Sequence, residues 1–159
     1  MGQYFRAVNK TKKEVICPWC LGGGAKLWEW AANPLGAVFT LLLRRSDGGG
    51  GGDFYGTGPQ MLEMDPAAPE KVFQAIAKGV AMEGEPIDAA PDSLVGRWAG
   101  DEVYLVGDYD SSELYDESRG YRNISRELAD TWNSFIEFKE MQLKYNPECT
   151  CETRAEGNR

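Results

Sequence analysis

The sequence predicts an α+β domain with a largely antiparallel sheet, built from hairpins and packed by three to four helices. Two hairpin patterns and several helix patterns support this class, and they do not alternate as regular β-α-β units. The length of 159 residues suits a single domain. We expect this domain to span residues 1–153, with flexible loops at 46–66 and 81–93, followed by a disordered tail at 154–159.

The first hairpin is expected at the start of the chain. The segment from Gln3 to Val8 is rich in aromatic and β-branched residues, and Glu14 to Cys17 follows as the returning strand. The polar stretch between them is typical of a turn. A second hairpin is predicted from residues 94–98 and 102–107, because the Gly100-Asp101 pair between them suits a tight turn.

The helices are predicted from composition and period. A short helix at 25–32 ends before a proline. The apolar stretch 36–45 has no period that separates a buried strand from a buried helix, but its leucines and arginines favour the helix. Apolar side chains at helical spacing predict an amphipathic helix over 67–80 and a final helix from an N-cap at Ser125 to about residue 142.

Charge and composition exclude several functions. The net charge of −8 disfavours general binding to nucleic acid phosphates, although residues 1–45 are basic. The chain has no histidine, which excludes Ser-His-Asp and Cys-His catalysis and every histidine-containing zinc motif. No stretch is apolar enough to span a membrane, and the N-terminus lacks a signal-peptide pattern, so we expect a cytoplasmic protein without a membrane partner.

The four cysteines form two close pairs. Cys17 and Cys20 have the spacing C-x-x-C, and Cys149 and Cys151 have the spacing C-x-C. Zinc binds four convergent thiolates, so the pairs predict a structural zinc site that fastens the C-terminal end to the first hairpin. Two alternatives stay open. One is a thioredoxin-like redox motif, although Leu-Gly-Gly-Gly follows where a helix is needed, and the other is four ordinary reduced thiols.

Acidic residues suggest a second metal site, for Mg²⁺ or Ca²⁺. Asp108 and Asp110 follow a predicted strand and, two apart on an extended chain, point the same way. Asp53, Asp101 and Glu113 are candidates to join them. The EF-hand pattern fails, because Glu113 stands where its glycine is required. The alternative is a set of turn aspartates in a solvated loop of an acidic protein.

Tryptophans and glycines offer weaker signals. Trp28 and Trp30 are two apart in a predicted helix, so one is expected in the core and the other exposed. Trp98 beside Arg97 is a candidate surface for stacking a base or sugar, with core packing as the alternative. The five glycines at 48–52 match no phosphate-binding pattern and predict a linker or lid.

Five short motifs stand along the chain: MGQYF-x-AVN at the start, GAKLWE, GGGD, GRWAGD and VGDYD. Together they resemble the motifs of a family of uncharacterised microbial proteins of bacterial or phage type. The resemblance covers most of the chain except 54–93 and implies no activity. It implies that the polar motif residues serve a site, because polar loop residues bind more often than they pack. These residues are Lys26, Glu29, Asp53, Arg97, Asp101 and Asp108.

Three functions follow from these patterns. The first is a small protein that binds a polar or nucleotide-like ligand through the motif residues together with Trp98 and Asp110. The second is a zinc-stapled interaction protein that docks on a larger assembly, for which an exposed Trp30 would be evidence. The third is a Mg²⁺-dependent hydrolase or phosphoryl-transfer enzyme using Asp108 and Asp110. No catalytic triplet is present, so the sequence leans against an enzyme and gives no oligomeric state.

Overall fold

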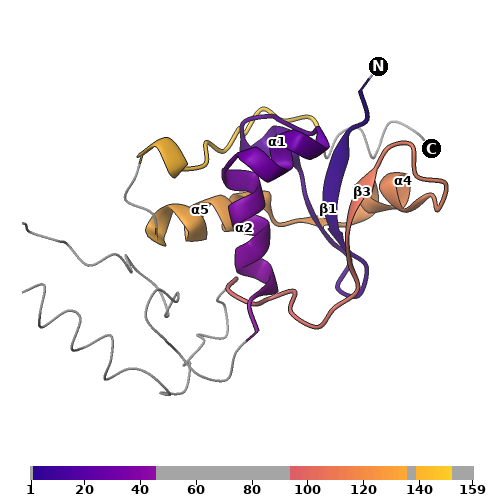
Figure 1. Ribbon diagram of the computed structural model, residues 1–159, viewed down its shortest axis with the longest axis horizontal. Helices are drawn as coiled ribbons and strands as arrows, with labels where there is room; N and C mark the ends of the chain where they lie inside the picture. Colours follow the sequence, from indigo (N-terminus) through magenta and orange to yellow (C-terminus); the bar gives the residue numbers. More distant parts are fainter. Residues whose placement is uncertain (1, 46–93, 136–138, 152–159) are drawn as a thin grey trace, which may run out of the picture.

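The computed structural model describes residues 2–45, 94–135 and 139–151. These residues form an α+β domain with a four-stranded mixed sheet and four α-helices (Figure 1). The helix predicted over 67–80 and both predicted loops lie outside the described residues, as does the predicted tail.

The sheet has the strand order β3-β1-β2-β4, so β1 (Phe5–Asn9) lies inside it. The first predicted hairpin is confirmed, because β1 pairs antiparallel with β2 (Glu14–Ile16). On its other side β1 pairs antiparallel with β3 (Val103–Gly107). The two-residue strand β4 (Arg122–Asn123) runs parallel to β2. The sheet is therefore largely antiparallel, as predicted.

Two helices follow the first hairpin. The short predicted helix is confirmed as α1 (Leu27–Ala32), and the ambiguous apolar stretch forms a helix, α2 (Pro34–Leu43). The side chain of Asn33 between them accepts a hydrogen bond from the first turn of α2. Further along the chain, α4 (Leu114–Glu117) is a single turn that continues into the 3-10 turn η2 (Ser118–Gly120). None of the described helices has the length and apolarity needed to cross a bilayer.

The second predicted hairpin is wrong, since β3 pairs with β1 and residues 95–98 form turns. The backbone of these turns completes the C-terminal end of α2. Gly96 N–H donates to Leu41 O at 2.9 Å, and Trp98 N–H donates to Leu42 O at 2.9 Å. Gly96 has a left-handed φ of +74°, which glycine adopts without steric cost. A backbone that satisfies the free carbonyls of a helix is not available for a strand.

The final helix α5 (Ser125–Phe135) is shorter than predicted, because residues 139–141 form a separate 3-10 turn. Ser125 is its first residue and not a side-chain cap. Asn123 Oδ1 accepts the Ser125 N–H at 3.0 Å, while the Ser125 hydroxyl accepts the Cys17 N–H at 2.8 Å. The serine therefore joins α5 to the end of β2.

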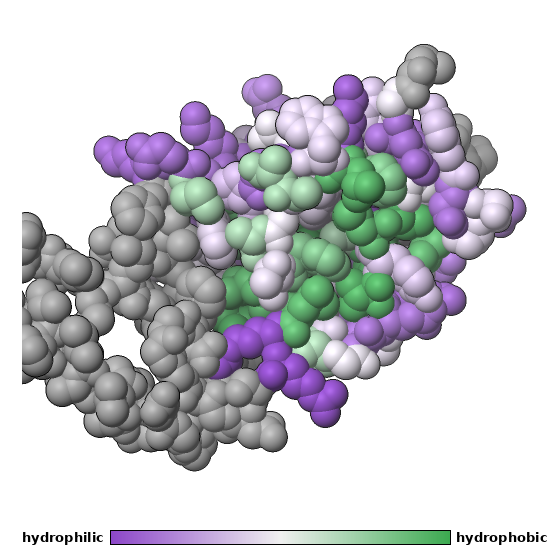
Figure 2. Space-filling model, in the orientation of Figure 1, coloured by the Kyte–Doolittle hydropathy of each residue, from purple (hydrophilic) through white to green (hydrophobic). Residues whose placement is uncertain are grey.

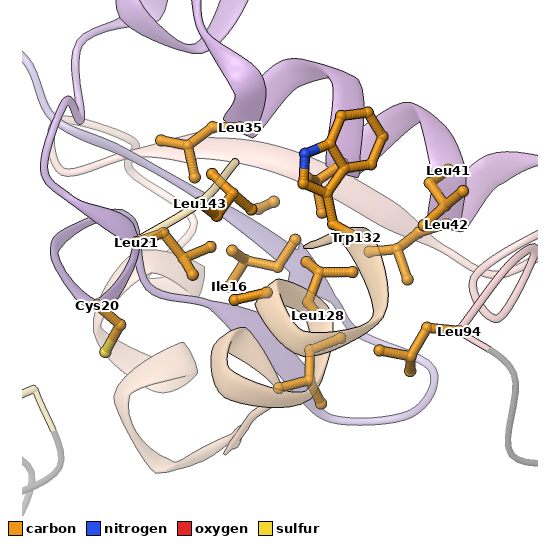
Figure 3. Close-up of a cluster of buried hydrophobic side chains, with 14 of the residues drawn as sticks. Ile16, Cys20, Leu21, Leu35, Leu41, Leu42, Leu94, Leu128, Trp132 and Leu143 are labelled. Atoms are coloured by element: carbon orange, nitrogen blue, oxygen red, sulfur yellow. The ribbon is translucent and has the colours of Figure 1, made fainter. Parts of the chain in front are cut away.

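Hydrophobic clusters cover both faces of the sheet. Neighbouring strand residues point to opposite faces, so Ile16 lies in the larger cluster and Val15 in the smaller one. Figure 3 shows the larger cluster, where leucines of α2 and α5 surround Ile16 together with Trp132. The smaller cluster lies between the sheet and α4, with Val8, Val106, Leu114, Tyr115 and Tyr121.

The tryptophans of α1 divide as predicted. Trp30 is 2% exposed in the core, whereas Trp28 is 65% exposed. The interaction hypothesis expected Trp30 to be exposed, and this expectation is wrong. The exposed tryptophan of α1 is Trp28. On the face shown in Figure 2, apolar side chains also gather over α2 and the neighbouring strands, bordered by hydrophilic ones. Half-buried residues that pack against the larger cluster include Phe5, Phe39 and Leu105.

Candidate metal centre

The two cysteine pairs meet in the folded chain. The Sγ atoms of Cys17, Cys20, Cys149 and Cys151 all lie within 4.8 Å of one another. Cys17 Sγ is 3.8 Å from Cys149 Sγ, and Cys20 Sγ is 3.3 Å from Cys151 Sγ. Thiolates about 2.3 Å from a tetrahedral zinc ion lie roughly 3.8 Å apart. The cluster can therefore hold a metal ion, and in the described ranges it is the only group of three or more such ligands.

The first pair is placed by a tight turn after β2. Cys20 lies in the 3-10 turn η1 (Pro18–Leu21), and its N–H donates to Cys17 O at 3.2 Å. Gly22 and Gly23 then turn the backbone away with left-handed φ angles of +95° and +86°. A four-residue turn thus replaces the longer helix that a thioredoxin-like motif needs after its first cysteine.

The second pair is placed by a segment that lies along the core. Leu143 is buried there, and its backbone N–H and C=O both bond the side chain of Asn133 in α5. Asn146 N–H donates to Cys20 O at 2.7 Å, just before the C-x-C pair begins. The backbone of this segment therefore brings the second pair to the first.

Asn123 of β4 connects the two pairs. Its Nδ2 donates to Cys20 Sγ and to Cys151 Sγ, each at 3.4 Å. Its Oδ1 is held by the first N–H of α5, so the amide cannot rotate freely. Hydrogen bonds of this kind orient metal ligands and stabilise thiolate charge. The cluster is also shielded, because Cys17 and Cys20 are buried and the other two cysteines are half-buried.

The thiols compete for negative charge when no cation is present. A hydrogen bond from the Cys20 thiol lowers the pKa of Cys17 to about 5, although burial opposes this shift. The same hydrogen bond raises the pKa of Cys20, and burial raises the pKa of Cys151 to about 12. Deprotonation of one thiol is therefore favourable. Deprotonation of a second thiol is unfavourable, since two negative charges would then share a poorly solvated site. A divalent cation removes that cost by pairing with all four sulfurs.

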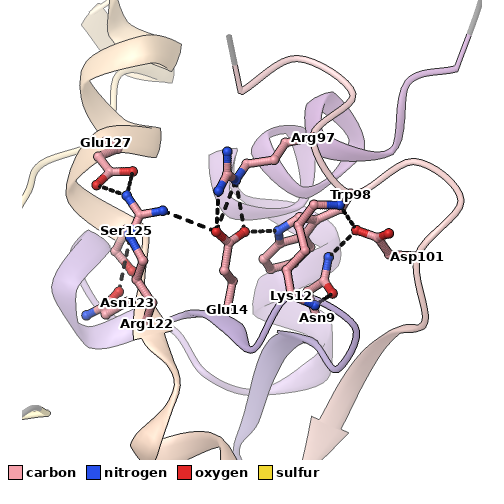
Figure 4. A network of polar contacts seen from close by, with 10 residues as sticks. All are labelled: Asn9, Lys12, Glu14, Arg97, Trp98, Asp101, Arg122, Asn123, Ser125 and Glu127. Atoms are coloured by element: carbon pink, nitrogen blue, oxygen red, sulfur yellow. Dashed lines mark hydrogen bonds and ion pairs between the residues drawn. The ribbon is translucent and has the colours of Figure 1, made fainter. Parts of the chain in front are cut away.

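Two residues of the predicted ligand set serve a buried carboxylate instead. Arg97 Nε donates to Glu14 Oε2 at 2.9 Å, and Trp98 Nε1 donates to the same oxygen at 2.8 Å (Figure 4). Trp98 is completely buried. Its predicted role as a stacking surface is wrong, because stacking on a ligand needs an exposed ring face, and the core-packing alternative is confirmed.

Asp101 bonds two residues at the turn of the first hairpin. Its Oδ2 accepts a hydrogen bond from Asn9 Nδ2 at 2.7 Å and pairs with Lys12 Nζ. The Lys12 ammonium, together with the Asn9 amide, holds the pKa of the Asp101 carboxyl below its ordinary value. Asn9 is completely buried. Asp101 therefore stabilises the fold at this position.

Two further residues of the predicted ligand set, Glu29 and Asp108, accept hydrogen bonds from backbone N–H groups. Glu29 Oε2 accepts the Lys26 N–H at 2.8 Å and so satisfies the backbone donor of the N-cap residue of α1. Asp108 Oδ1 accepts the Tyr4 N–H at 3.0 Å, at the end of the sheet. These contacts belong to separate elements from those of Arg97.

Asp110 is the member of the set that lines a hollow, of about 310 Å³, beside β3. Its Oδ1 accepts the N–H of Ser112 at 2.9 Å and also bonds the Ser112 hydroxyl, and these bonds lower its pKa. No third acidic side chain forms a ligand group with Asp108 and Asp110 in the described ranges. Asp53 lies outside the described residues. The described members of the set thus do not share one pocket.

The sequence did not single out three residues: Glu14, Asn123, and Arg6, which lines two hollows with the cysteines. Glu14 is acidic and lies near a predicted turn, so the sequence suggests an exposed side chain. Its burial depends on tertiary contacts that the sequence does not show. Asn123 has no local signal, because its partners are distant cysteines. Arg6 offered a signal, since a charged residue stands between the apolar residues Phe5 and Ala7 in a predicted strand.

Comparison of the chain with protein-family models, curated proteins and solved structures finds no match. The family resemblance of the five motifs therefore stays a prediction, and the function is argued from the geometry of the chain itself.

Proposed function

We propose that this chain is a zinc-clasped interaction domain, in which Cys17, Cys20, Cys149 and Cys151 bind one structural zinc ion. The gathering of all four Sγ atoms within 4.8 Å carries the proposal, because Cys20 and Cys151 are 131 residues apart in sequence. Thiolates select soft or borderline metals such as zinc over Mg²⁺ and Ca²⁺. Four protein ligands leave no open position for a substrate, so the ion stabilises the fold and performs no reaction.

The C-terminal segment explains why such a clasp is useful. Among described residues 139–151, Leu143 is the only buried one. Burial of one leucine contributes about 1.5–3 kcal/mol, which is little for holding an ordered segment. The free energy of metal binding adds to the free energy of folding when the site forms only in the folded chain. Zinc therefore supplies the attachment that apolar packing does not.

Native mass spectrometry with metal analysis tests the clasp. We expect one zinc ion per chain, lost in Cys149→Ser. Glu148→Gln is the matched control, because it changes the neighbouring exposed residue without removing a ligand, and it should keep the ion. A wild-type chain that carries no zinc and four free thiols contradicts the proposal. Retention of full zinc by Cys149→Ser would contradict it equally.

The docking function is supported by the outer face of α1. Leu27 and Trp28 are adjacent there and are 56% and 65% exposed. Tryptophan is enriched in the centres of protein interfaces. We propose this face as the contact with a partner protein. Trp28→Ala should weaken partner capture by the zinc-loaded chain without changing its zinc content, and unchanged capture contradicts the assignment.

A second candidate function is ligand binding in the hollow beside β3. Its lining combines Lys10, Tyr104, Asp110 and Glu117 with apolar side chains, a mixture that suits a small polar molecule. Chemical-shift titration of the zinc-loaded chain with AMP, and separately with Mg²⁺ alone, tests this function. Shifts at Lys10 and Asp110 that disappear in Lys10→Met support it. The absence of shifts at millimolar AMP or Mg²⁺ rejects it.

A further inference from the structure

We propose that Arg6 is the counter-ion of the cysteine centre, and that its positive charge raises the affinity of the centre for zinc. This inference rests on the proposed zinc site. Zn²⁺ bound by four thiolates carries a net charge of about −2, which follows from the charges of the ligands. A buried charge is unfavourable unless cations or hydrogen-bond donors surround it.

Arg6 lines two hollows that are also lined by cysteines. It belongs to the central strand β1 and is only 9% exposed. Together with Cys17 and Cys151 it lines a small hollow of about 20 Å³. Together with Cys149 and Cys151 it lines a second hollow of about 260 Å³. Three of the four proposed ligands therefore border spaces that Arg6 also borders.

Arg6 has no carboxylate partner among the described residues, in contrast to Arg97 and Arg122, which both pair with Glu14. Its Nε is buried without a hydrogen-bond partner in the described part of the chain. The guanidinium carbon lies 4.7 Å from the ring centre of Tyr115 and 5.6 Å from that of Trp19. Aromatic faces stabilise such a cation only partly, so a nearby anion is still favourable.

Arg119 contributes to the same environment. It lines the smaller hollow with Arg6, and its Nε is likewise buried without a partner in the described residues. Arg119 is already paired with Asp116, however, through an Nη2–Oδ1 contact of 3.0 Å. A hollow of about 20 Å³ has room for one water molecule, which needs roughly 10–15 Å³. Of the two arginines, Arg6 is therefore the one that forms no ion pair with a carboxylate of the described residues, although Glu148 also lines the larger hollow.

The test is the zinc dissociation constant of the full chain, measured by competition with a chromophoric chelator. Arg6→Gln should weaken zinc binding about 10–100-fold, the usual range for groups that support metal ligands. Lys13→Gln removes the same charge from an exposed position and should change the constant by less than about twofold, because exposed charges are screened. The loss in Arg6→Gln should persist in high salt, since buried charges are screened much less.

Arg6→Lys separates charge from packing. It keeps the positive charge but loses the planar group between the two rings, so zinc affinity should stay within about fivefold of wild type if charge decides. A loss as large as that of Arg6→Gln overturns the counter-ion role and makes Arg6 a packing residue. If Arg6→Gln does not fold with excess zinc, Arg6→Lys decides alone: an affinity within about fivefold of wild type supports the counter-ion role, and a larger loss overturns it.

The outcomes also separate this inference from the zinc site itself. A wild-type chain that binds no zinc refutes both. A wild-type chain that binds zinc with an affinity unchanged by Arg6→Gln refutes the counter-ion alone. In that case bound chloride, detected by a chloride-dependent shift of the Arg6 Nε resonance, would identify a small anion as the partner that satisfies Arg6.

Discussion

Arg97 and Glu14 form an ion pair inside the protein although 83 residues separate them, with Arg97 Nε 2.9 Å from Glu14 Oε2. Arg122 Nη1 lies 3.2 Å from the other carboxylate oxygen, and the Trp98 indole donates the third contact. Glu14 is 2% exposed. One carboxylate thus connects β2, β4 and the turn that completes α2.

Glu14→Gln should lower the free energy of unfolding by about 3 kcal/mol, because it leaves the Arg97 charge without compensation in a largely buried site. Urea denaturation of the zinc-loaded chain measures this. Glu102→Gln is the control, since Glu102 pairs with Lys10 at the surface and should cost less than about 1 kcal/mol. Equal losses in the two variants would show that the burial of Glu14 is unimportant.

Acid should destabilise the protein through the same carboxyl. Burial raises the pKa of Glu14, but the hydrogen bonds from Arg97 and Trp98 and the arginine charge outweigh it and hold the pKa below its ordinary value. A carboxyl with a lower pKa in the folded state stabilises the protein above its unfolded pKa, about 4.3 for Glu. This stability is lost as the pH falls through the folded pKa.

The free energy of unfolding should therefore fall as the pH drops below about 4, and fall less in Glu14→Gln. Acid also releases zinc from thiolates in both proteins, so the difference between their pH profiles isolates the carboxyl. Parallel profiles would argue against a lowered pKa of Glu14.

Removal of the metal should be non-additive across the cysteines. With zinc present at about 1,000 times its dissociation constant, binding stabilises the folded chain by about 4 kcal/mol. Cys20→Ser or Cys151→Ser alone should remove most of this, and the double variant should remove little more, because both act through one ion. Thermal unfolding with and without a chelator measures the effect. Additive losses would indicate two independent thiol contacts.

Gly96→Ala should destabilise the turn that completes α2 by about 2–4 kcal/mol, from a left-handed backbone and a steric overlap together. A Cβ at Gly96 would lie 2.5 Å from Arg44 O. Gly120→Ala is the matched control, because its Cβ would meet no atom within 4 Å and its φ is not positive. Urea denaturation compares the two, and similar losses would contradict the steric explanation.

The two tryptophans of α1 should respond differently to truncation. Trp30→Ala should cost about 3–5 kcal/mol, since Trp30 is buried and its Nε1 donates to Phe5 O at 3.3 Å. Trp28→Ala should change stability by less than about 0.5 kcal/mol, as expected of an exposed side chain. Thermal unfolding tests both. A large loss in Trp28→Ala would make Trp28 structural and would weaken its proposed role in docking.

Local patterns predicted the local structure. The first hairpin and α1 follow from residues that lie close together, and the pairing of β1 with β2 needs only a short turn. Residues 94–98 resemble a strand in composition but satisfy the end of α2, a partner that composition does not show. The same limit applies to Glu14, whose donors come from positions 97, 98 and 122.

The cysteine centre was predictable because only two points had to meet, and the spacing within each pair is short. The predicted set of polar ligand-binding residues could not be predicted correctly in this way, because it required several distant motifs to converge on one pocket. Trp98 and Asp101 instead bond residues of the first hairpin, and the side chains of Glu29 and Asp108 each accept a backbone N–H in a separate element. Polar motif residues of this kind can have a purely structural role, because they cap helices or form buried ion pairs.

The clasp also has a topological consequence. An ion bound by the proposed clasp would join position 20 to position 151 and so close nearly the whole chain into a ring. A single backbone cut anywhere between these positions would then leave two fragments that still migrate together in a denaturing but non-chelating solvent that preserves the metal–sulfur bonds. Addition of a chelator would separate them.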